Sequence, residues 1–225
     1  MSPRRLLVDH VLIVTHDPKS TIGGLYERTG LRALSGGEHV GLGTRNHIVP
    51  LGNGFLEIVE VHDKALARHN AFGRLGLAGL ANAIARGAPD SLFAWSTAVP
   101  DIAPVAERTG TEIMALTRAG VSAMLCGIDQ AIDDPSRPFF LQRGPDDANP
   151  GARPTAHAVE PIGFTRLDAT RSSAAPEVWL PNVPSGSVTV NLLDDNRRGL
   201  TRVEIGIRGA DPVVLTAEQP TGIAR

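Results

Sequence analysis

Apolar residues in this chain gather in short runs separated by polar turns, and the first runs predict a strand, a helix and then more strands. Residues 6–15 are rich in β-branched side chains and predict a buried strand. A turn at residues 17–20 supplies Asp and Ser as caps for a helix that should end at Gly30. Residues 46–51 and 55–61 then predict two strands, joined by a Gly-Asn-Gly hairpin.

The second part of the chain repeats this order. Its predicted elements are a strand at residues 92–99, a helix at 101–108, and strands at 121–125 and 138–142. Both predicted helices end in the tetrapeptide Glu-Arg-Thr-Gly, whose copies begin at Glu27 and Glu107, 107 − 27 = 80 residues apart. This period is too long for a solenoid repeat and too short for two independent domains. We therefore expect two half-domains that share one core.

The rest of the chain connects and extends these halves. Alanine-rich helical spacing predicts a connecting helix at residues 63–86, and two stretches rich in Pro, Asp and Gly predict loops at 133–138 and 144–154, the second placed to cover a pocket. Beyond residue 154 the pattern predicts strands at residues 162–170, 187–192 and 200–207, with a turn at 194–196. We interpret them as a β extension, with a reduced third module as the alternative. The expected units are a first module (1–61), a connecting helix (62–89), a second module (90–154) and the extension (155–225).

Composition narrows the class of protein. The chain has 225 residues, of which 42% are hydrophobic, and a formal charge of −2, which gives no electrostatic footprint for nucleic acid or anionic lipid. The single Cys126 has apolar neighbours and predicts a buried, inert thiol. The N-terminus lacks the apolar region of a signal peptide, and no run approaches the ~20 residues that span a bilayer. We expect a cytoplasmic protein with a small-molecule partner, no nucleic-acid or membrane partner, and a bacterial-type, arginine-rich composition; homodimerisation through edge strands stays open.

The predicted βαβββ unit occurs twice. Its first copy opens with Asp-His-Val-Leu-Ile at residues 9–13 and closes with Phe-Leu-Glu-Ile at 55–58, and further characteristic stretches are residues 41–46, 138–142 and 149–154. Together these residues resemble the vicinal oxygen chelate superfamily, and more narrowly its glyoxalase-like domain branch. The resemblance spans residues 7–170 and implies an α+β fold of paired βαβββ modules, of the glyoxalase, bleomycin-resistance and dioxygenase type, with a C-terminal β extension.

The resemblance also implies a divalent metal, held at facing positions on the first and last strands of each module. The first module offers His10 and Glu57, an imidazole and a carboxylate suited to a first-row divalent metal. In the second module Ala94 corresponds to His10 and cannot ligate, while Gln142 corresponds to Glu57 and is a neutral oxygen donor. The implied metal site is therefore His10, Glu57 and Gln142, and Zn, Fe, Mn, Ni and Mg are not distinguished.

Each candidate also has a structural interpretation. His10 suits a strand histidine bonded to a backbone carbonyl as well as a ligand. Glu57 interrupts an apolar run and shares a strand face with Phe55, so its carboxylate needs a metal, a cation or a raised pKa, and we take it as the candidate catalytic residue. His47 and His157 favour pocket-lining or surface roles, and they are also the two candidates to complete a metal site. The remaining histidines, in turns, in the polar loop at 35–39 or on a polar helix face, receive no functional role: His16, His39, His62 and His69.

Three functions fit these residues. The first is an enzyme whose metal polarises vicinal oxygens of a small oxygen-rich substrate, with isomerase, lyase, hydrolase and dioxygenase chemistry all open. The second is a non-catalytic binding or sequestering protein with a degenerate metal site. The third is a structural protein with a vestigial cleft. We favour the enzyme because Glu57 is costly to retain for packing. The expected pocket is lined by Asn46, His47, Phe55, Trp95, Phe140 and His157.

Overall fold

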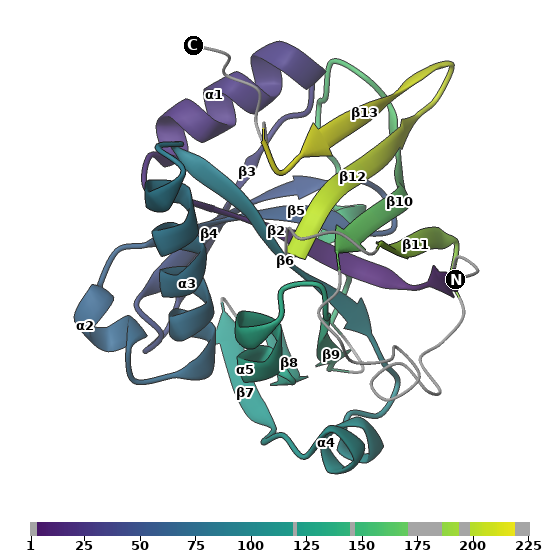
Figure 1. Cartoon of the computed structure of the whole chain (residues 1–225). Helices are drawn as coiled ribbons and strands as arrows, with labels where there is room; N and C mark the ends of the chain where they lie inside the picture. Colours follow the sequence, from purple (N-terminus) through teal and green to yellow (C-terminus); the bar gives the residue numbers. More distant parts are fainter. Residues whose placement is uncertain (1–3, 119–120, 145–146, 171–185, 194–198, 219–225) are drawn as a thin grey trace.

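The chain folds into two β-sheets and a small number of helices (Figure 1). The computed structural model describes residues 4–118, 121–144, 147–170, 186–193 and 199–218. One sheet has eight strands in the order β3-β4-β5-β2-β6-β9-β8-β7, and the other has five in the order β1-β11-β10-β12-β13. The turn predicted at residues 194–196 lies outside the described residues.

The eight-stranded sheet is built from two βαβββ modules, as the repeat predicts. The first module consists of β2 (Val8–Thr15), α1 (Pro18–Thr29), β3 (Leu34–His39), β4 (Thr44–Pro50) and β5 (Phe55–Val61). The second consists of β6 (Asp90–Ala98), α4 (Ala103–Thr109), β7 (Met114–Arg118), β8 (Val121–Cys126) and β9 (Phe139–Arg143). The first strands of the two modules, β2 and β6, pair antiparallel at the centre. The outer strands β3 and β7 also contact each other, so the sheet curves nearly into a barrel.

The duplicated tetrapeptide closes corresponding helices. Helix α1 is capped by Asp17, whose side chain accepts a hydrogen bond from the Ser20 backbone N–H at 3.0 Å. It ends at Gly30 with φ 72°, and α4 ends at Gly110 with φ 67°. Both glycines adopt the left-handed conformation that a side chain disfavours. The sequence repeat therefore corresponds to a structural repeat.

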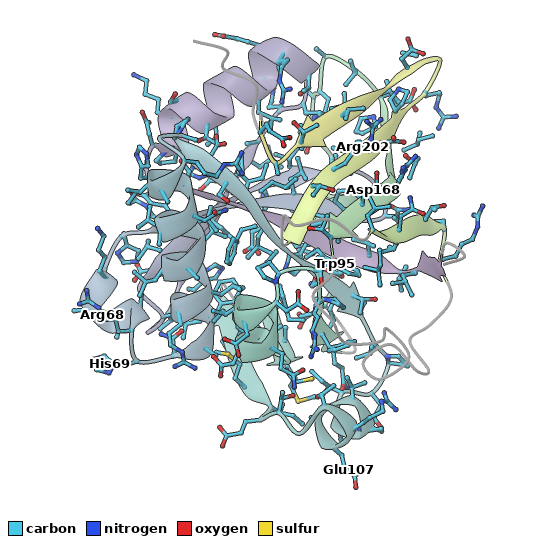
Figure 2. All side chains as sticks on the ribbon, viewed as in Figure 1. Arg68, His69, Trp95, Glu107, Asp168 and Arg202 are labelled. Carbon is cyan, nitrogen blue, oxygen red and sulfur yellow. The ribbon has the colours of Figure 1, made fainter. Side chains whose placement is uncertain are left out.

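The five-stranded sheet covers one face of the eight-stranded sheet. Its strands are β1 (Arg4–Leu6), β10 (Pro161–Thr170), β11 (Val188–Leu193), β12 (Gly199–Ile207) and β13 (Ala210–Thr216). Inward side chains of this sheet, such as Phe164 and Val203, share a core with Val11 and Trp95 of the central strands. Figure 2 shows Trp95 between the sheets and Asp168 and Arg202 on the second sheet. The extension thus buries the convex face of the paired modules, and the N-terminal β1 joins it.

The opposite, concave face is partly filled by a helix. The predicted connecting helix is in fact two, α2 (Lys64–Ala67) and α3 (Ala71–Ala85), because the Asn70 side chain caps α3 by accepting from the Gly73 N–H at 2.6 Å. Helix α3 packs closely on the sheet at Gly79, where an added Cβ would lie 2.5 Å from Val14 Cγ2. A short helix α5 (Ile128–Asp133) and strands β3, β7 and β13 were not predicted. Among the described residues, no helix has the length and apolar character needed to cross a membrane.

Candidate functional site

A pocket lies on the concave side of the paired modules, between the central strands and α3. Its volume is about 60 Å³, which has room for a few non-hydrogen atoms such as one end of a small molecule. Its walls are mostly apolar, and four ionisable side chains reach it: His10, His39, Glu57 and Arg143. The apolar lining consists of Phe55, Phe72, Leu116, Ala123, Leu125, Phe139, Leu141 and Pro150.

His10 is held at the floor of this pocket by partners on both sides of its ring. Its Nδ1 lies 2.7 Å from Asp9 Oδ1 and 2.9 Å from Ser96 Oγ. The ring stacks on Phe55 with centroids 4.8 Å apart and meets Phe139 edge-on at 5.4 Å. Because an ionised carboxylate only accepts hydrogen bonds, Nδ1 carries the proton and donates it to Asp9.

A β-bulge explains how neighbouring residues can meet in this way. Adjacent side chains of a strand normally point to opposite faces. Val8 pairs with Thr97 and His10 with Ser96, so β2 advances two residues while β6 advances one. The extra residue, Asp9, turns to the same side as His10. Bulges of this kind re-aim side chains next to functional sites.

Glu57 sits beside His10 and is surrounded by hydrogen-bond donors. His10 Nε2 lies 3.4 Å from Glu57 Oε2, and His39 Nε2 lies 3.4 Å from Glu57 Oε1. The Asn46 side-chain amide donates to Glu57 Oε1. His39 is fixed in turn by Thr44, whose Oγ1 lies 2.8 Å from His39 Nδ1.

The buried Glu57 carboxyl stays ionised. Burial would raise its pKa, but the hydrogen bond with His39, the charges that His10 and His39 carry when protonated, and the hydrogen bond from Asn46 outweigh burial and lower the pKa to about 2. Of the three possibilities that the sequence left for this residue, the structure supports a cationic partner and not a raised pKa. A carboxyl with so low a pKa is a weak base at neutral pH. Glu57 is better suited to hold a positive charge than to remove a proton.

His10 Nε2 lacks a hydrogen-bond partner within this group. It is buried and has no such partner among the described residues, yet it faces the Glu57 carboxylate. A nitrogen lone pair directed at a carboxylate oxygen is repelled, so the pair is stabilised when a proton or another cation occupies the space between them.

The second module contributes apolar walls and no matching acid or base. The pairing of β6 with β9 places Ser96 opposite Phe139, as β2 with β5 places His10 opposite Phe55. Ser96 therefore corresponds to His10 and Leu141 to Glu57, whereas the sequence offsets had assigned Ala94 and Gln142. Gln142 points away from the pocket, because its Oε1 accepts a hydrogen bond from the Ile102 N–H at 2.8 Å and thereby holds the start of α4.

The other four residues that the sequence placed in the pocket lie outside it. Trp95 is fully buried on the convex side and donates from Nε1 to the Ser136 carbonyl at 3.2 Å, and Phe140 packs under α4. His157 accepts from the Arg32 N–H at 2.9 Å through Nδ1 and approaches the Pro50 carbonyl at 2.8 Å through Nε2. His47 is half-buried and does not line the pocket. The structure brings together His10, Asn46, Glu57 and Phe55.

Sequence reasoning did not assign a role to several residues that the structure places here: Asp9, His39, Ser96, Phe139 and Arg143. His39 was assigned to a polar loop, but it ends strand β3 and is only 1% exposed. The polar residues around His39 give no signal of this position in the sequence, because it follows from the pairing of His39 with Thr44 across the β3–β4 turn.

The donor set does not complete a metal site of the kind expected. His10 Nε2 and Glu57 Oε2 are two donors aimed at one space, but the described residues contain no group of three or more His, Cys, Asp or Glu arranged to hold a metal ion. Catalytic metal sites usually draw three protein ligands. Ser96 is engaged by His10, and Leu141 offers no donor atom. The described residues therefore do not fit a catalytic metal ion at this position.

The comparisons with known proteins identify the family to which this two-module fold belongs. A family model described as glyoxalase-like domain matches residues 8–180. The chain belongs to this family of the vicinal oxygen chelate superfamily, as its sequence predicts. No curated protein matches the chain.

Solved structures agree with this fold. A hypothetical protein from Staphylococcus aureus is 14% identical, with 93% of each chain covered and a TM-score of 0.65. Methylmalonyl-CoA epimerase from Mycobacterium tuberculosis is 14% identical over 65% of this chain and 94% of its own, with a TM-score of 0.43. The first of these likenesses extends over the C-terminal sheet and shows that the whole two-sheet fold occurs in another protein.

Proposed function

We propose that this protein is an enzyme that moves a proton on a small carbonyl compound, with His10 as the base. The observation that carries the proposal is the buried Nε2 of His10, which faces the pocket and Glu57 without a hydrogen-bond partner among the described residues. The surrounding groups are arranged for a ring that gains and loses a charge. This proposal gives the catalytic role to His10, whereas the sequence favoured Glu57.

The chemistry follows from the positions of the protons. The Asp9 carboxylate fixes the proton on Nδ1, so the lone pair of the neutral ring is on Nε2. His10 Nε2 removes a proton from a carbon next to a carbonyl, the electron pair of that C–H bond moves onto the carbonyl oxygen, and an enolate forms. The imidazolium then lies between Asp9 and Glu57 and returns the proton to another face or another atom. Isomerisation and lyase reactions share this step.

The apolar walls support the same assignment. Contacts with Phe55 and Phe139 restrict the motion of the His10 ring, so the ring stays close to the orientation that proton transfer requires. The low polarity of the pocket strengthens the interaction of the imidazolium with the two carboxylates. Small size and apolar walls together favour a substrate with a short hydrocarbon body.

Hydrogen–deuterium exchange tests the proposal without knowledge of the final product. The protein is incubated in D2O with a panel of small hydroxyketones, keto acids and keto esters, and NMR follows deuterium at the carbon next to the carbonyl. We expect at least one compound to exchange in the wild type and the His10→Gln variant to exchange it about 10² to 10⁴ times more slowly. His47→Gln is the matched control, because His47 lies on β4 of the same sheet and outside the pocket. Unchanged exchange in His10→Gln would refute the assignment.

Two observations support a second candidate function, that of a protein that binds a small molecule without catalysis. The second module supplies only Ser96 and Leu141 at the positions that match His10 and Glu57, and the pocket is small and apolar. A binder should show ligand-induced rises in melting temperature and no exchange with any compound of the panel. Adding divalent ions to chelator-treated protein tests the metal expectation in the same assay. An ion held by His10 and Glu57 should raise the melting temperature, and either His10→Gln or Glu57→Gln should abolish that rise.

A further inference from the structure

Arg143 stands at the wall of the pocket with much of its hydrogen-bonding capacity unused. It is the last residue of β9, and its side chain is 16% exposed. Its hydrogen bonds to Asp9 run along one edge of the guanidinium: Nη2 donates to Asp9 Oδ1 at 2.6 Å and Nε to Asp9 Oδ2 at 3.3 Å. A guanidinium has five N–H donors. Within the described residues, the donors on Nη1 meet no acceptor.

The ring of Phe55 keeps this guanidinium in the pocket. Arg143 Cζ lies 5.8 Å from the Phe55 centroid, and Phe55 also stacks on His10. Asp9 binds both groups, since the same Oδ1 atom lies 2.7 Å from His10 Nδ1 and 2.6 Å from Arg143 Nη2. A single buried carboxylate, 1% exposed, therefore sets the separation of the base and the guanidinium.

We propose that Arg143 binds the carboxylate of the substrate and that the pocket selects small organic acids with an apolar body. The free edge of the guanidinium matches the planar oxygens of a carboxylate. The carbon chain then lies against Phe72, Leu116 and Leu125, and the carbon beside the acid or its keto group faces His10. The inference rests on the proposed function for the reaction, whereas the selection of an acid is a property of binding alone.

Matched ligand pairs test this selection. Propionate and propionamide, and isovalerate and isovaleramide, differ in charge but hardly in shape, and their binding is measured by calorimetry at low and high salt. We expect the wild type to bind each acid at least about tenfold more tightly than its amide, with the acid alone weakened by salt. Equal binding of acid and amide by the wild type overturns the proposal.

Variants assign the selection to Arg143. Arg143→Gln should reduce the acid preference to near unity, and Arg143→Lys should keep part of it while preserving a positive charge beside Asp9 if the glutamine variant fails to fold. Arg166→Gln is the control, because Arg166 forms a comparable 2.8 Å pair with Asp168 in the second sheet. Retention of the preference in both Arg143 variants overturns the assignment.

The His10→Gln variant separates this inference from the proposed function. It should lose proton exchange and keep the preference for acids, because Arg143 remains in place. Loss of the preference in Arg143→Gln together with unchanged exchange in His10→Gln would leave the binding inference standing and remove the catalytic one. The opposite pattern, with exchange lost in His10→Gln and the acid preference unchanged in the Arg143 variants, would remove the role of Arg143 alone.

Discussion

The Glu57→Gln variant should be less stable than the wild type at neutral pH, and the difference should shrink in acid. The pKa of Glu57 is lowered from an ordinary 4.5 to about 2, chiefly because His39, His10 and Asn46 overcome the effect of burial. At about 1.36 kcal/mol per pH unit, a lowering of about 2.5 pH units corresponds to roughly 3 kcal/mol. Glu57 is buried, so solvent screening does not reduce this figure substantially.

The sign of the pH dependence follows from the direction of the shift. The folded state holds the ionised carboxylate more tightly than the unfolded state does, so the contribution is complete above pH 4.5 and is lost as the pH falls toward 2. Between pH 6 and pH 3, roughly 2 kcal/mol of the wild-type advantage over Glu57→Gln should disappear. Asp9 also has a lowered pKa, because hydrogen bonds and charges from His10 and Arg143 outweigh its burial, but Asp9 is present in both proteins and its effect cancels.

Urea unfolding followed by circular dichroism at several pH values measures this difference. Glu60→Gln is the control, because Glu60 lies on the same strand and pairs with the exposed Arg45 at 2.7 Å, a surface interaction of about 0–1 kcal/mol. A gap between wild type and Glu57→Gln that stays constant from pH 6 to pH 3 would show that the histidines and Asn46 do not stabilise the carboxylate as described.

Three further predictions concern the site and its support. Asp9→Asn should slow the His10-dependent exchange about tenfold or more, because the carboxylate that fixes the Nδ1 proton is lost; deuterium NMR checks this, and an unchanged rate would contradict it. Gly79→Ala should destabilise the fold by about 1–3 kcal/mol in urea unfolding, because its Cβ meets Val14, whereas Gly23→Ala, with open space around it, should be neutral or stabilising. Cys126 is buried and its pKa is raised by that burial, so a thiol reagent should label it slowly in the native protein and rapidly in urea; rapid native labelling would show that the β8 end opens.

The sequence predicted the fold well where hydrophobic pattern and local turn signals agree. The repeat, the helix ends at Gly30 and Gly110, and the β4–β5 hairpin are all present, because each is specified by residues close in sequence. Strand β3 was missed because its Leu-Ser-Gly-Gly-Glu-His sequence has weak strand propensity. It becomes a strand by pairing with β4, which local patterns do not encode.

The candidate site was predicted in its first module and misassigned in its second. Alternation along β5 placed Glu57 on the face of Phe55, and both line the pocket. Along β9 the assignment was one residue off, and a one-residue slip in a strand exchanges its faces. Gln142 and Phe140 were therefore chosen in place of Leu141 and Phe139. The register between strands depends on bulges, and sequence offsets between repeat copies do not reveal them.

The bulge at Asp9 has a counterpart further along the same pair of strands. Leu12 pairs with Ala94 and Ile13 with Leu92, so here β6 contains the extra residue, Phe93. The two extra residues compensate for each other, so the register of β2 against β6 is the same before and after the segment between them. Only the three-residue window of β2 from His10 to Leu12 is displaced. The pair of bulges therefore shifts the side chains of this segment by one position against β6, while the strands on either side, and with them the two modules, keep their alignment.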